Sequence, residues 1–307
     1  MKCVLGFDGG GTKTECVAMD LSLSVVARGR GPASNPTRVG FESAARNVKQ
    51  VADATVAAWK ETAEIASLCA GLAGTARPEN HARMKQLLEE KFPGVAIELC
   101  TDLDLPLAAM ADGPAIVLVV GTGSAAVGRD QTGKQSREGG YGAAGSDEGS
   151  AFDIGRAAVS SARKASNAEE FALSRQILRH LGCSSWQEVD AKASANADEV
   201  FPRVFPVVAA SADAGNALAQ LLLNSAAAKL AQIASRLAES LGMAQQAFPL
   251  AKTGGTIGRS QFFDQALDRA LGAMLPRAVI RPLLADPAET AARIALRNIA
   301  GREGTPR

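Results

Sequence analysis

Two turns in the chain combine glycine with threonine, serine or lysine. The first is the stretch DGGGTKT at residues 8–14, and the second is GTGS at residues 121–124. Glycine lets backbone N–H groups approach an anion without an obstructing Cβ, and neighbouring hydroxyl groups add hydrogen-bond donors. We therefore expect the two turns to bind the phosphates of a nucleotide from two sides. Asp8 ends the apolar stretch before the first turn, where a carboxylate can hold Mg²⁺ directly or through water together with phosphate oxygens.

Neither turn fits a familiar phosphate-binding motif. In a P-loop the lysine directly follows a glycine, whereas Gly11 is followed here by Thr12. The stretch GTGSAA satisfies GxGxxA, but a second strand, and not the helix of a dinucleotide fold, is expected after it. A glycine-rich hairpin remains an alternative for either turn taken alone.

The elements that must position these turns are short apolar strands and amphipathic helices. A helix is expected over residues 41–62, and alanine- and leucine-rich helices follow residue 147. Residues 115–128 repeat the strand, turn, strand order of residues 4–18, which suggests a duplicated domain. The mixture indicates an α/β protein. Strands are expected near residues 3–8, 14–20, 23–28, 66–71, 95–101, 115–120, 124–128 and 247–255.

Composition excludes several classes of function. With 33 basic and 32 acidic residues, the chain has no charge excess for binding nucleic acid or an anionic membrane. Its two histidines lie far apart in the sequence, so neither a catalytic triad with histidine nor a zinc site is expected. Five dispersed cysteines are typical of free thiols in a reducing compartment, and neither a signal peptide nor a membrane span is recognisable. We expect a cytoplasmic protein that binds neither nucleic acid nor membranes.

The motifs resemble a known family. DGGGTKT paired with VVGTGS resembles the two phosphate loops of the actin, Hsp70 and sugar kinase superfamily. SNPTRVG, TDLDLPLAAM, VVGTGSAAVG and GGYGAAGSDEGSAFDIG resemble the BadF/BadG/BcrA/BcrD ATPase family, more closely its N-acetylglucosamine kinase and glucosamine kinase members. The resemblance implies a duplicated ribonuclease H-like, actin/hexokinase-type α/β fold with mixed sheets and an interdomain cleft. The two actin-like ATPase domains would span residues 1–112 and 113–287, with a C-terminal helix at about 288–307 packing back on the first.

The resemblance also implies roles for individual residues. Asp8 would be the metal-linked carboxylate, and Asp102 would be the catalytic base that contacts the attacking hydroxyl. The implied ATP-binding residues are Gly10, Gly11, Thr12, Lys13, Gly121, Thr122, Gly123, Ser124, Gly215, Gly254 and Gly255. The implied substrate-binding residues are Asn35, Asp102, Gly140, Tyr141, Gly142 and Asp147.

Several of these residues have a purely structural alternative. Asp102 and Asp104 both stand where a helix N-cap is expected. Asp147 could open the helix that follows it, because acidic residues are favoured at helix N-termini. Asn35 could be only a turn residue, and Tyr141 could pack beneath its own loop.

The chain departs from the family pattern at two places. Ser146 stands where a glycine usually precedes DEGS, and DPAETAARIA stands where a Gly-Ala pair commonly opens the last helix. The second departure concerns how the final helix closes over the nucleotide. Neither alters the phosphate turns.

The implied activity is ATP-dependent phosphorylation of an amino sugar at its 6-hydroxyl, with N-acetylglucosamine or glucosamine as the substrate. ATP and Mg²⁺ are the implied cofactors, a small amino sugar is the implied partner, and the family suggests a homodimer. One alternative is the activator ATPase of a reductive dehydratase, which carries an iron–sulfur cluster, although dispersed cysteines argue against it. Another is a non-enzymatic, actin-like or sugar-sensing ATPase.

Overall fold

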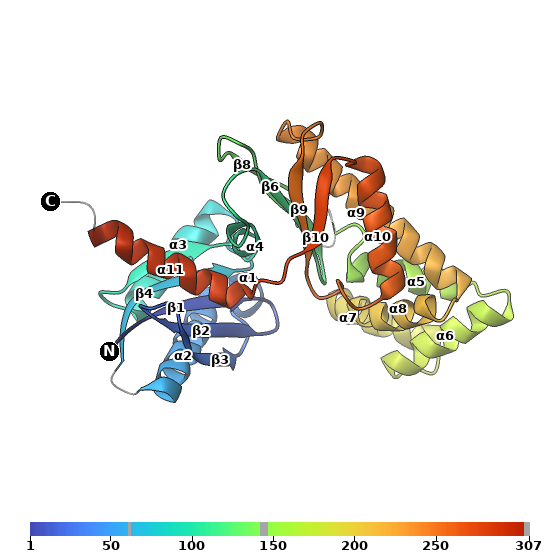
Figure 1. Cartoon of the computed structure of the whole chain (residues 1–307). Helices are drawn as coiled ribbons and strands as arrows, with labels where there is room; N and C mark the ends of the chain where they lie inside the picture. Colours follow the sequence, from blue (N-terminus) through green and yellow to red (C-terminus); the bar gives the residue numbers. More distant parts are fainter. Residues whose placement is uncertain (61–62, 142–146, 304–307) are drawn as a thin grey trace. The chain divides into compact units, whose positions relative to one another are not determined.

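The computed structural model describes residues 1–60, 63–141 and 147–303, and it contains two compact units (Figure 1). One unit comprises residues 1–111 and the C-terminal segment from residue 284, and the other comprises residues 112–283. Each unit is built on a five-stranded mixed sheet with helices packed against it. The expected α/β fold with two mixed sheets is confirmed.

The first sheet has the order β3-β2-β1-β4-β5. Strands β1, β2 and β3 are antiparallel neighbours, whereas β4 and β5 run parallel to β1. Because the carboxyl ends of β1, β4 and β5 lie at one edge, Asp8 and the segments that follow β4 and β5 meet there. The strands are β1 (Lys2–Gly9), β2 (Thr14–Asp20), β3 (Val25–Gly31), β4 (Glu64–Leu72) and β5 (Ala96–Cys100).

Helices cover both faces of this sheet. Alternate residues of β1 point to opposite faces, so Leu5 and Phe7 pack in the core that contains residues of α2 (Phe41–Trp59) and α3 (Pro78–Lys91), while Val4 packs with α11 (Pro287–Glu303). Helix α11 crosses β1 in Figure 1. A Cβ on Gly6 would collide with the backbone of Ala292, so only glycine allows α11 to approach β1 so closely.

The second sheet repeats the design of the first, with the order β10-β9-β6-β7-β8. Here β6, β7 and β8 are antiparallel neighbours, and β9 and β10 run parallel to β6. The GTGS turn therefore occupies the position in this sheet that DGGGTKT occupies in the first. The strands are β6 (Ala115–Val120), β7 (Ser124–Arg129), β8 (Gln135–Gly139), β9 (Phe248–Thr253) and β10 (Ala278–Pro282).

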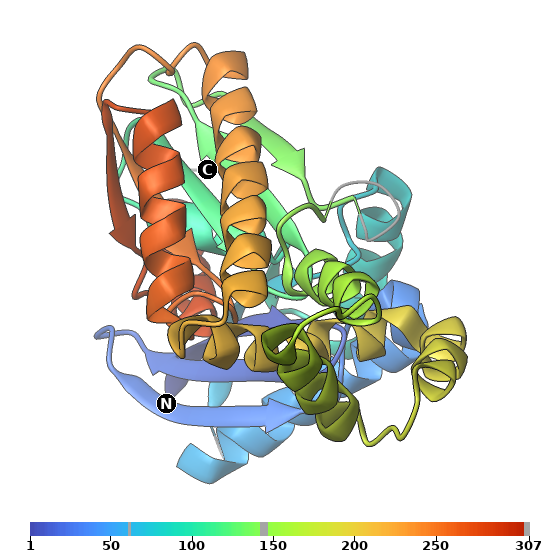
Figure 2. The same cartoon turned by 90° about the vertical axis from the view of Figure 1, so that its right-hand side faces the viewer.

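Helices α9 and α10 lie side by side in this unit (Figure 2). Leu230, Ile233 and Leu237 of α9 are buried, so this helix turns an apolar face to the core. No helix among the described residues is long and apolar enough to cross a membrane. The helices of this unit are α5 (Ala151–Ala162), α6 (Ala168–Leu181), α7 (Trp186–Val200), α8 (Phe205–Asp213), α9 (Ala217–Ser240) and α10 (Gln261–Met274), with a 3₁₀ turn at Pro202–Val204.

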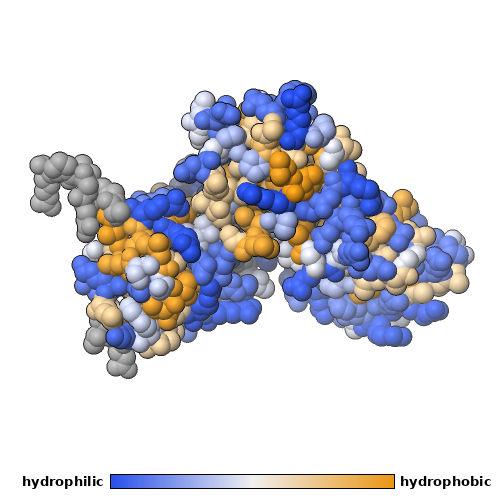
Figure 3. All heavy atoms as spheres, viewed as in Figure 1, coloured by the Kyte–Doolittle hydropathy of each residue, from blue (hydrophilic) through white to orange (hydrophobic). Residues whose placement is uncertain are grey.

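Each expected strand is found, and the two strands that were not expected, β8 and β10, are edge strands. Strand β8 reads QSREG, which has no apolar alternation, and β10 is only five residues long. Hydrophobic residues are visible over the region of β10 (Figure 3), where Val279 is 61% exposed. Pro282 ends this strand, and a proline on an edge limits pairing with another chain.

Candidate functional site

Asp8 lies in an acidic environment at the carboxyl end of β1. It pairs with Glu15 across the hairpin and with Gly71 on the parallel side. Burial is the main reason that the pKa of Asp8 rises to about 6, the neighbouring charge of Asp102 is the second, and Glu15 adds to it, while Lys13 opposes the rise. The carboxylate is therefore near Asp102 and lacks a cation that fully compensates its charge.

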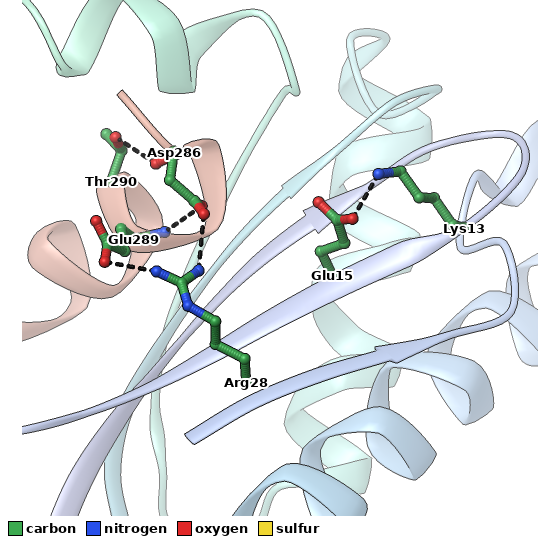
Figure 4. A network of polar contacts seen from close by, with 6 residues as sticks. All are labelled: Lys13, Glu15, Arg28, Asp286, Glu289 and Thr290. Atoms are coloured by element: carbon green, nitrogen blue, oxygen red, sulfur yellow. Dashed lines mark hydrogen bonds and ion pairs between the residues drawn. The ribbon is translucent and has the colours of Figure 1, made fainter. Parts of the chain in front are cut away.

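The cations around the first turn are engaged in ion pairs (Figure 4). Lys13 Nζ lies 2.5 Å from Glu15 Oε1. Arg28 donates to Asp286 Oδ2 and to Glu289 Oε1, each at 2.7 Å, and so ties β3 to the start of α11. Asp286 also accepts from the Glu289 N–H at 3.0 Å, as an N-cap does. Acidic partners thus hold Lys13 beside the first turn and Arg28 at the start of α11.

Gly10 has no structural need to be glycine. Its N–H donates to Lys13 O at 3.0 Å, and its carbonyl accepts from the N–H groups of Ser34 and Asn35 at 3.2 Å each. A Cβ on Gly10 would meet nothing among the described residues of its unit closer than Lys13 O at 3.9 Å, and its φ lies outside the left-handed region. Glycine at this position instead leaves the turn open to a ligand.

Arg38 lies against Gly11. A Cβ on Gly11 would be 2.9 Å from Arg38 Cδ and 3.2 Å from its Nε and Nη1 atoms. The guanidinium group matches phosphate in shape and charge, so Arg38 is a further candidate at the first turn. The sequence reading missed it. The available signal was a basic residue three positions after Asn35 in SNPTRVG.

Asp102 follows β5 and is half-buried. The N-cap of α4 (Asp104–Ala108) is Leu103, which makes no side-chain capping hydrogen bond, so neither Asp102 nor Asp104 is the N-cap. Asp104 Oδ2 instead accepts from the N–H and hydroxyl groups of Thr101, each at 2.8 Å. The capping alternative is wrong for both residues, and Asp104 has a local structural role.

Asn35 lies in the loop after β3 and caps the short helix α1 (Pro36–Val39). Its Oδ1 atom accepts from Thr37 N at 3.0 Å and from Thr37 Oγ1 at 2.7 Å. Gly74, with φ at +84°, makes room for it, because a Cβ there would collide with Asn35 Oδ1. The Asn35 amide nitrogen forms no hydrogen bond with the described residues, so it can donate to a ligand.

The second turn is held by the segment that precedes α5. Gly121 N donates to Gly123 O at 2.8 Å. Ser124 donates from its backbone N–H to Asp147 Oδ1 at 3.2 Å and from its hydroxyl to Glu148 O at 2.7 Å. A Cβ on Gly123 would lie 2.7 Å from the same Asp147 oxygen. Gly123 thus makes room for the carboxylate that fixes the turn.

Asp147 does not cap the helix that follows it. That helix begins at Ala151, and its N-cap is Ser150, whose hydroxyl accepts from Asp153 N at 3.2 Å. The capping alternative for Asp147 is therefore wrong. Burial raises the pKa of Asp147, and the hydrogen bond from Ser124 opposes the rise. Contact between Asp147 and a sugar stays a prediction.

The glycine pair after β9 lies beside the second turn. A Cβ on Gly121 would be 3.9 Å from Gly255 N, and Thr256 donates to Val120 O from its backbone at 3.2 Å and its hydroxyl at 2.8 Å. Gly254 has φ at +112°, and a Cβ there would collide with Val120 O. A Cβ on Gly255 would meet nothing among described residues within 4 Å. The fold therefore requires Gly254, whereas Gly255 is open to a ligand.

Gly215 lies between α8 and α9 with φ at +90°, and its N–H donates to Ala212 O at 3.0 Å. The neighbouring Asp213 accepts from Ser260 Oγ and Phe262 N, each at 2.8 Å. These bonds join the turn at Gly215 to the loop that follows the glycine pair. Its role toward a nucleotide stays a prediction.

The predicted substrate loop after β8 is only partly described. Gly140 has φ at +72°, and the ring of Tyr141 is 64% exposed, with the Arg137 guanidinium 4.7 Å from its centroid. Gly142 lies outside the described residues.

Comparison with known proteins identifies a family and two relatives of the chain. The profile of the BadF/BadG/BcrA/BcrD ATPase family matches residues 5–292. The chain is 26% identical over 309 residues to a Dictyostelium discoideum protein named N-acetyl-D-glucosamine kinase, covering 95% of this chain and 97% of that protein. It is also 26% identical over 302 residues to the N-acetylmuramic acid/N-acetylglucosamine kinase of Clostridium acetobutylicum, covering 96% of this chain and 98% of that protein.

Solved structures share the fold. A Chromobacterium violaceum protein named as a candidate N-acetylglucosamine kinase superposes with a TM-score of 0.77 at 24% identity, covering 96% of this chain and 99% of that chain. A ROK family glucokinase from Streptomyces griseus, in complex with glucose and AMPPNP, superposes with a TM-score of 0.60 at 16% identity, covering 96% and 99%. Because the family profile spans nearly the whole sequence, the chain belongs to the BadF/BadG/BcrA/BcrD ATPase family.

Proposed function

We propose that the protein is an ATP-dependent amino-sugar kinase, which transfers a phosphoryl group from Mg-ATP to the 6-hydroxyl of N-acetylglucosamine or glucosamine. The names of both curated relatives include N-acetylglucosamine, which supports this substrate class. The observation that carries the proposal is the closeness of Asp8 and Asp102 at the edge of the sheet that also holds the open turn at Gly10. Phosphoryl transfer needs this set: a base, a metal-linked carboxylate and backbone donors.

Asp102 would accept the proton of the attacking sugar hydroxyl. It is half-buried, it is not the N-cap of α4, and it lies near the carboxylate of Asp8. A positioned base of this kind contributes about 10²- to 10⁴-fold to a rate. The turns at residues 10–13 and 121–124 would bind the phosphates through N–H groups other than those of Gly10, Gly121 and Ser124, which already donate within the fold. Gly254, Gly255 and Gly215 would lie on the nucleoside side.

Asp8 suits a magnesium ion whose other ligands are phosphate oxygens and water, and not a metal site closed by several protein ligands. Among the residues that the structure describes, no three His, Cys, Asp or Glu side chains form a metal-binding group. Magnesium in nucleotide sites is commonly held by one or two carboxylates, with phosphate oxygens and water completing its shell. A cation beside Asp8 would favour its ionised form, which burial and Asp102 disfavour. When bound, Mg²⁺ would neutralise charge on the phosphates.

We assign sugar recognition to the loop after β3 and to the segment after β8, as the resemblance implies. Asn35 offers its amide nitrogen, and Asp147, Gly140, Tyr141 and Gly142 would complete the contacts. A site that hydrogen-bonds neighbouring hydroxyls rejects analogues that lack them. The partner is therefore a small amino sugar.

The iron–sulfur alternative requires cysteines in an accessible loop. None of the five cysteines is exposed; Cys100 is half-buried and the others are buried. The sulfur atoms of Cys69 and Cys100 lie 4.0 Å apart in the neighbouring strands β4 and β5. This distribution favours the kinase over the activator ATPase. A purely actin-like or sugar-sensing role would not need Asp102 as a base.

The remaining assignments follow from the same proposal. We assign the actin-like ATPase domains to residues 1–112 and 113–287, with the helix from about residue 288 belonging to the first. The free thiols fit the reducing cytoplasm. The family suggests a homodimer, and light scattering coupled to gel filtration tests it.

The test of the proposed function is coupled ADP release with Mg-ATP. The substrates are N-acetylglucosamine, glucosamine, N-acetylmannosamine and glucose, each with wild type, Asp102→Asn and the control Asp104→Asn. We expect one amino sugar to stimulate wild type, the first variant to lose at least about 100-fold in turnover, and the control to keep most of its activity. Turnover that no sugar stimulates contradicts the proposal.

A further inference from the structure

A partly buried ion pair lies behind the second turn, at residues to which the sequence patterns assigned no role. Asp153 of α5 is 6% exposed. Its Oδ2 atom accepts from Lys229 Nζ of α9 at 2.8 Å and from Gly149 N at 3.0 Å, and its Oδ1 atom accepts from Arg156 at 3.0 Å. One carboxylate thus joins α9 to the backbone of the segment before α5.

That segment holds the second turn by backbone and side-chain bonds. Besides the bonds from Ser124 to Asp147 and Glu148, the backbone N–H groups at positions 151 and 152 donate to the carbonyls of Gly121 and Thr122 at 3.0 and 3.2 Å. Each residue of the turn except Gly123 is therefore bonded to residues 147–152. Any displacement of this segment moves the turn.

Helix α9 also contacts Gly149 directly. Gly149 has φ at +74°, and a Cβ there would lie 2.6 Å from Ala226 O and 2.6 Å from Leu230 Cγ. Residues 226, 229 and 230 follow one face of the helix, so they approach Gly149 and Asp153 together. The helix therefore fixes the segment by contact at Gly149 and by charge at Asp153.

The carboxylate of Asp153 keeps its negative charge in the folded protein. Burial alone would raise the pKa of Asp153, but the hydrogen bonds from Lys229, Gly149 N and Arg156 outweigh it and lower the pKa overall. Removing Lys229 would leave a nearly buried carboxylate with one fewer cationic partner. Such a group would draw in water or shift toward Arg156, and either movement displaces Gly149.

We propose that the Lys229–Asp153 pair is a positioning element for the second phosphate turn, whose loss weakens binding of the nucleotide more than binding of the sugar, for which Asp147 is the proposed contact in the same segment. The inference rests on the proposed function insofar as it takes the ligand of this turn to be ATP. Lys229 and Asp153 act through residues 147–152 and do not touch the nucleotide.

The experiment compares Lys229→Met, Lys229→Arg and Asp153→Asn with wild type. The control is Arg163→Met, which breaks another ion pair of the same unit, the 2.5 Å contact with Asp190, far in sequence from the second turn. Affinity for AMP-PNP is measured by calorimetry, KM for ATP and for N-acetylglucosamine by coupled assay, and folding by circular dichroism.

We expect Lys229→Met to weaken AMP-PNP binding and to raise KM for ATP by about tenfold, because displaced groups in such sites cost factors of this size. KM for the sugar should rise by a clearly smaller factor, because Asp147 is the one residue of the segment that is a proposed sugar contact. Lys229→Arg should restore most of the affinity, and the control should match wild type. If Lys229→Met does not fold, Asp153→Asn carries the test, because its amide oxygen still accepts from Gly149 N.

Unchanged AMP-PNP affinity in a folded Lys229→Met variant, or equal rises in both KM values, overturns the proposal. The wild-type data separate this inference from the proposed function. AMP-PNP binding without sugar-stimulated turnover refutes the kinase, while the variant affinities still decide the role of the pair. A wild-type protein that does not bind AMP-PNP refutes both.

Discussion

Replacing Gly10 with alanine separates a glycine that a ligand needs from the neighbouring glycines that the fold needs. A Cβ on Gly10 is free of contacts within its unit up to 3.9 Å, and its φ is one that alanine adopts. The substitution should therefore stabilise the protein by about 0.4–1 kcal/mol, because alanine restricts the unfolded chain. It should also weaken nucleotide binding, since the Cβ keeps a phosphate from the backbone donors. Losing one charge-assisted hydrogen bond costs about 1.5–3 kcal/mol, which is roughly 10- to 100-fold in affinity.

Two matched variants make this comparison sharp. Gly9→Ala would collide with Ser34 Oγ and Leu72 Cδ2, and Gly254→Ala would collide with Val120 O at a φ of +112°. Each should lower the free energy of unfolding by about 1–3 kcal/mol. Urea denaturation measures stability, and calorimetry with AMP-PNP measures affinity. A Gly10→Ala protein that binds AMP-PNP as wild type does would refute the assignment of this turn to phosphate.

Three further predictions follow from the charges around the first turn. The pKa of Asp8 is raised from 3.8 to about 6, so its favourable contribution to stability is complete below pH about 4 and is lost as the pH rises through about 6. Asp8→Asn should remove this dependence of stability on pH, and its free energy of unfolding at pH 7.5 should exceed that of wild type by about 2 kcal/mol. Urea unfolding at pH 5 and 7.5 measures this, and an equal change of unfolding free energy in both proteins would contradict the prediction. Arg28→Ala should cost about 1 kcal/mol of unfolding free energy, less in 1 M salt, because its contacts with Asp286 and Glu289 are partly exposed; an effect that salt does not reduce would contradict this. Arg38→Met should raise KM for ATP several-fold, with Arg46→Met at the surface of α2 as control; equal KM values for the two variants would remove Arg38 from the site.

The sequence predicted the strands with an apolar pattern and the glycine turns between them. It also predicted the family, because the diagnostic stretches are contiguous in the chain. The edge strands β8 and β10 were not predicted because they are short and lack sustained apolar alternation.

The roles of individual acidic residues were harder to predict. Asp104, Asp147 and Ser150 all have side chains that cap helices well, and only the backbone path shows that Ser150 caps α5 while the other two hold loops. Lys229 resembles any exposed residue of an amphipathic helix in sequence. Its partner lies 76 positions away, so only the fold reveals it.

Glycines that are neighbours in the sequence can be glycine for different structural reasons. Gly254 and Gly255 are adjacent, yet only Gly254 has a positive φ and a carbonyl in the space of its Cβ. The resemblance in sequence assigns both glycines alike to the ATP-binding residues. The structure distinguishes the residue that shapes the turn from the one that leaves room beside it.

Identification of the phosphorylated product tests the central claim most directly. Wild type and Asp102→Asn are incubated with Mg-ATP and N-acetylglucosamine or glucosamine, and the products are analysed by phosphorus and proton NMR. We predict that wild type forms a sugar 6-phosphate in step with ADP, and that the variant forms almost none while still binding AMP-PNP. Free phosphate without a sugar ester, or a 6-phosphate formed equally fast by the variant, would contradict the account.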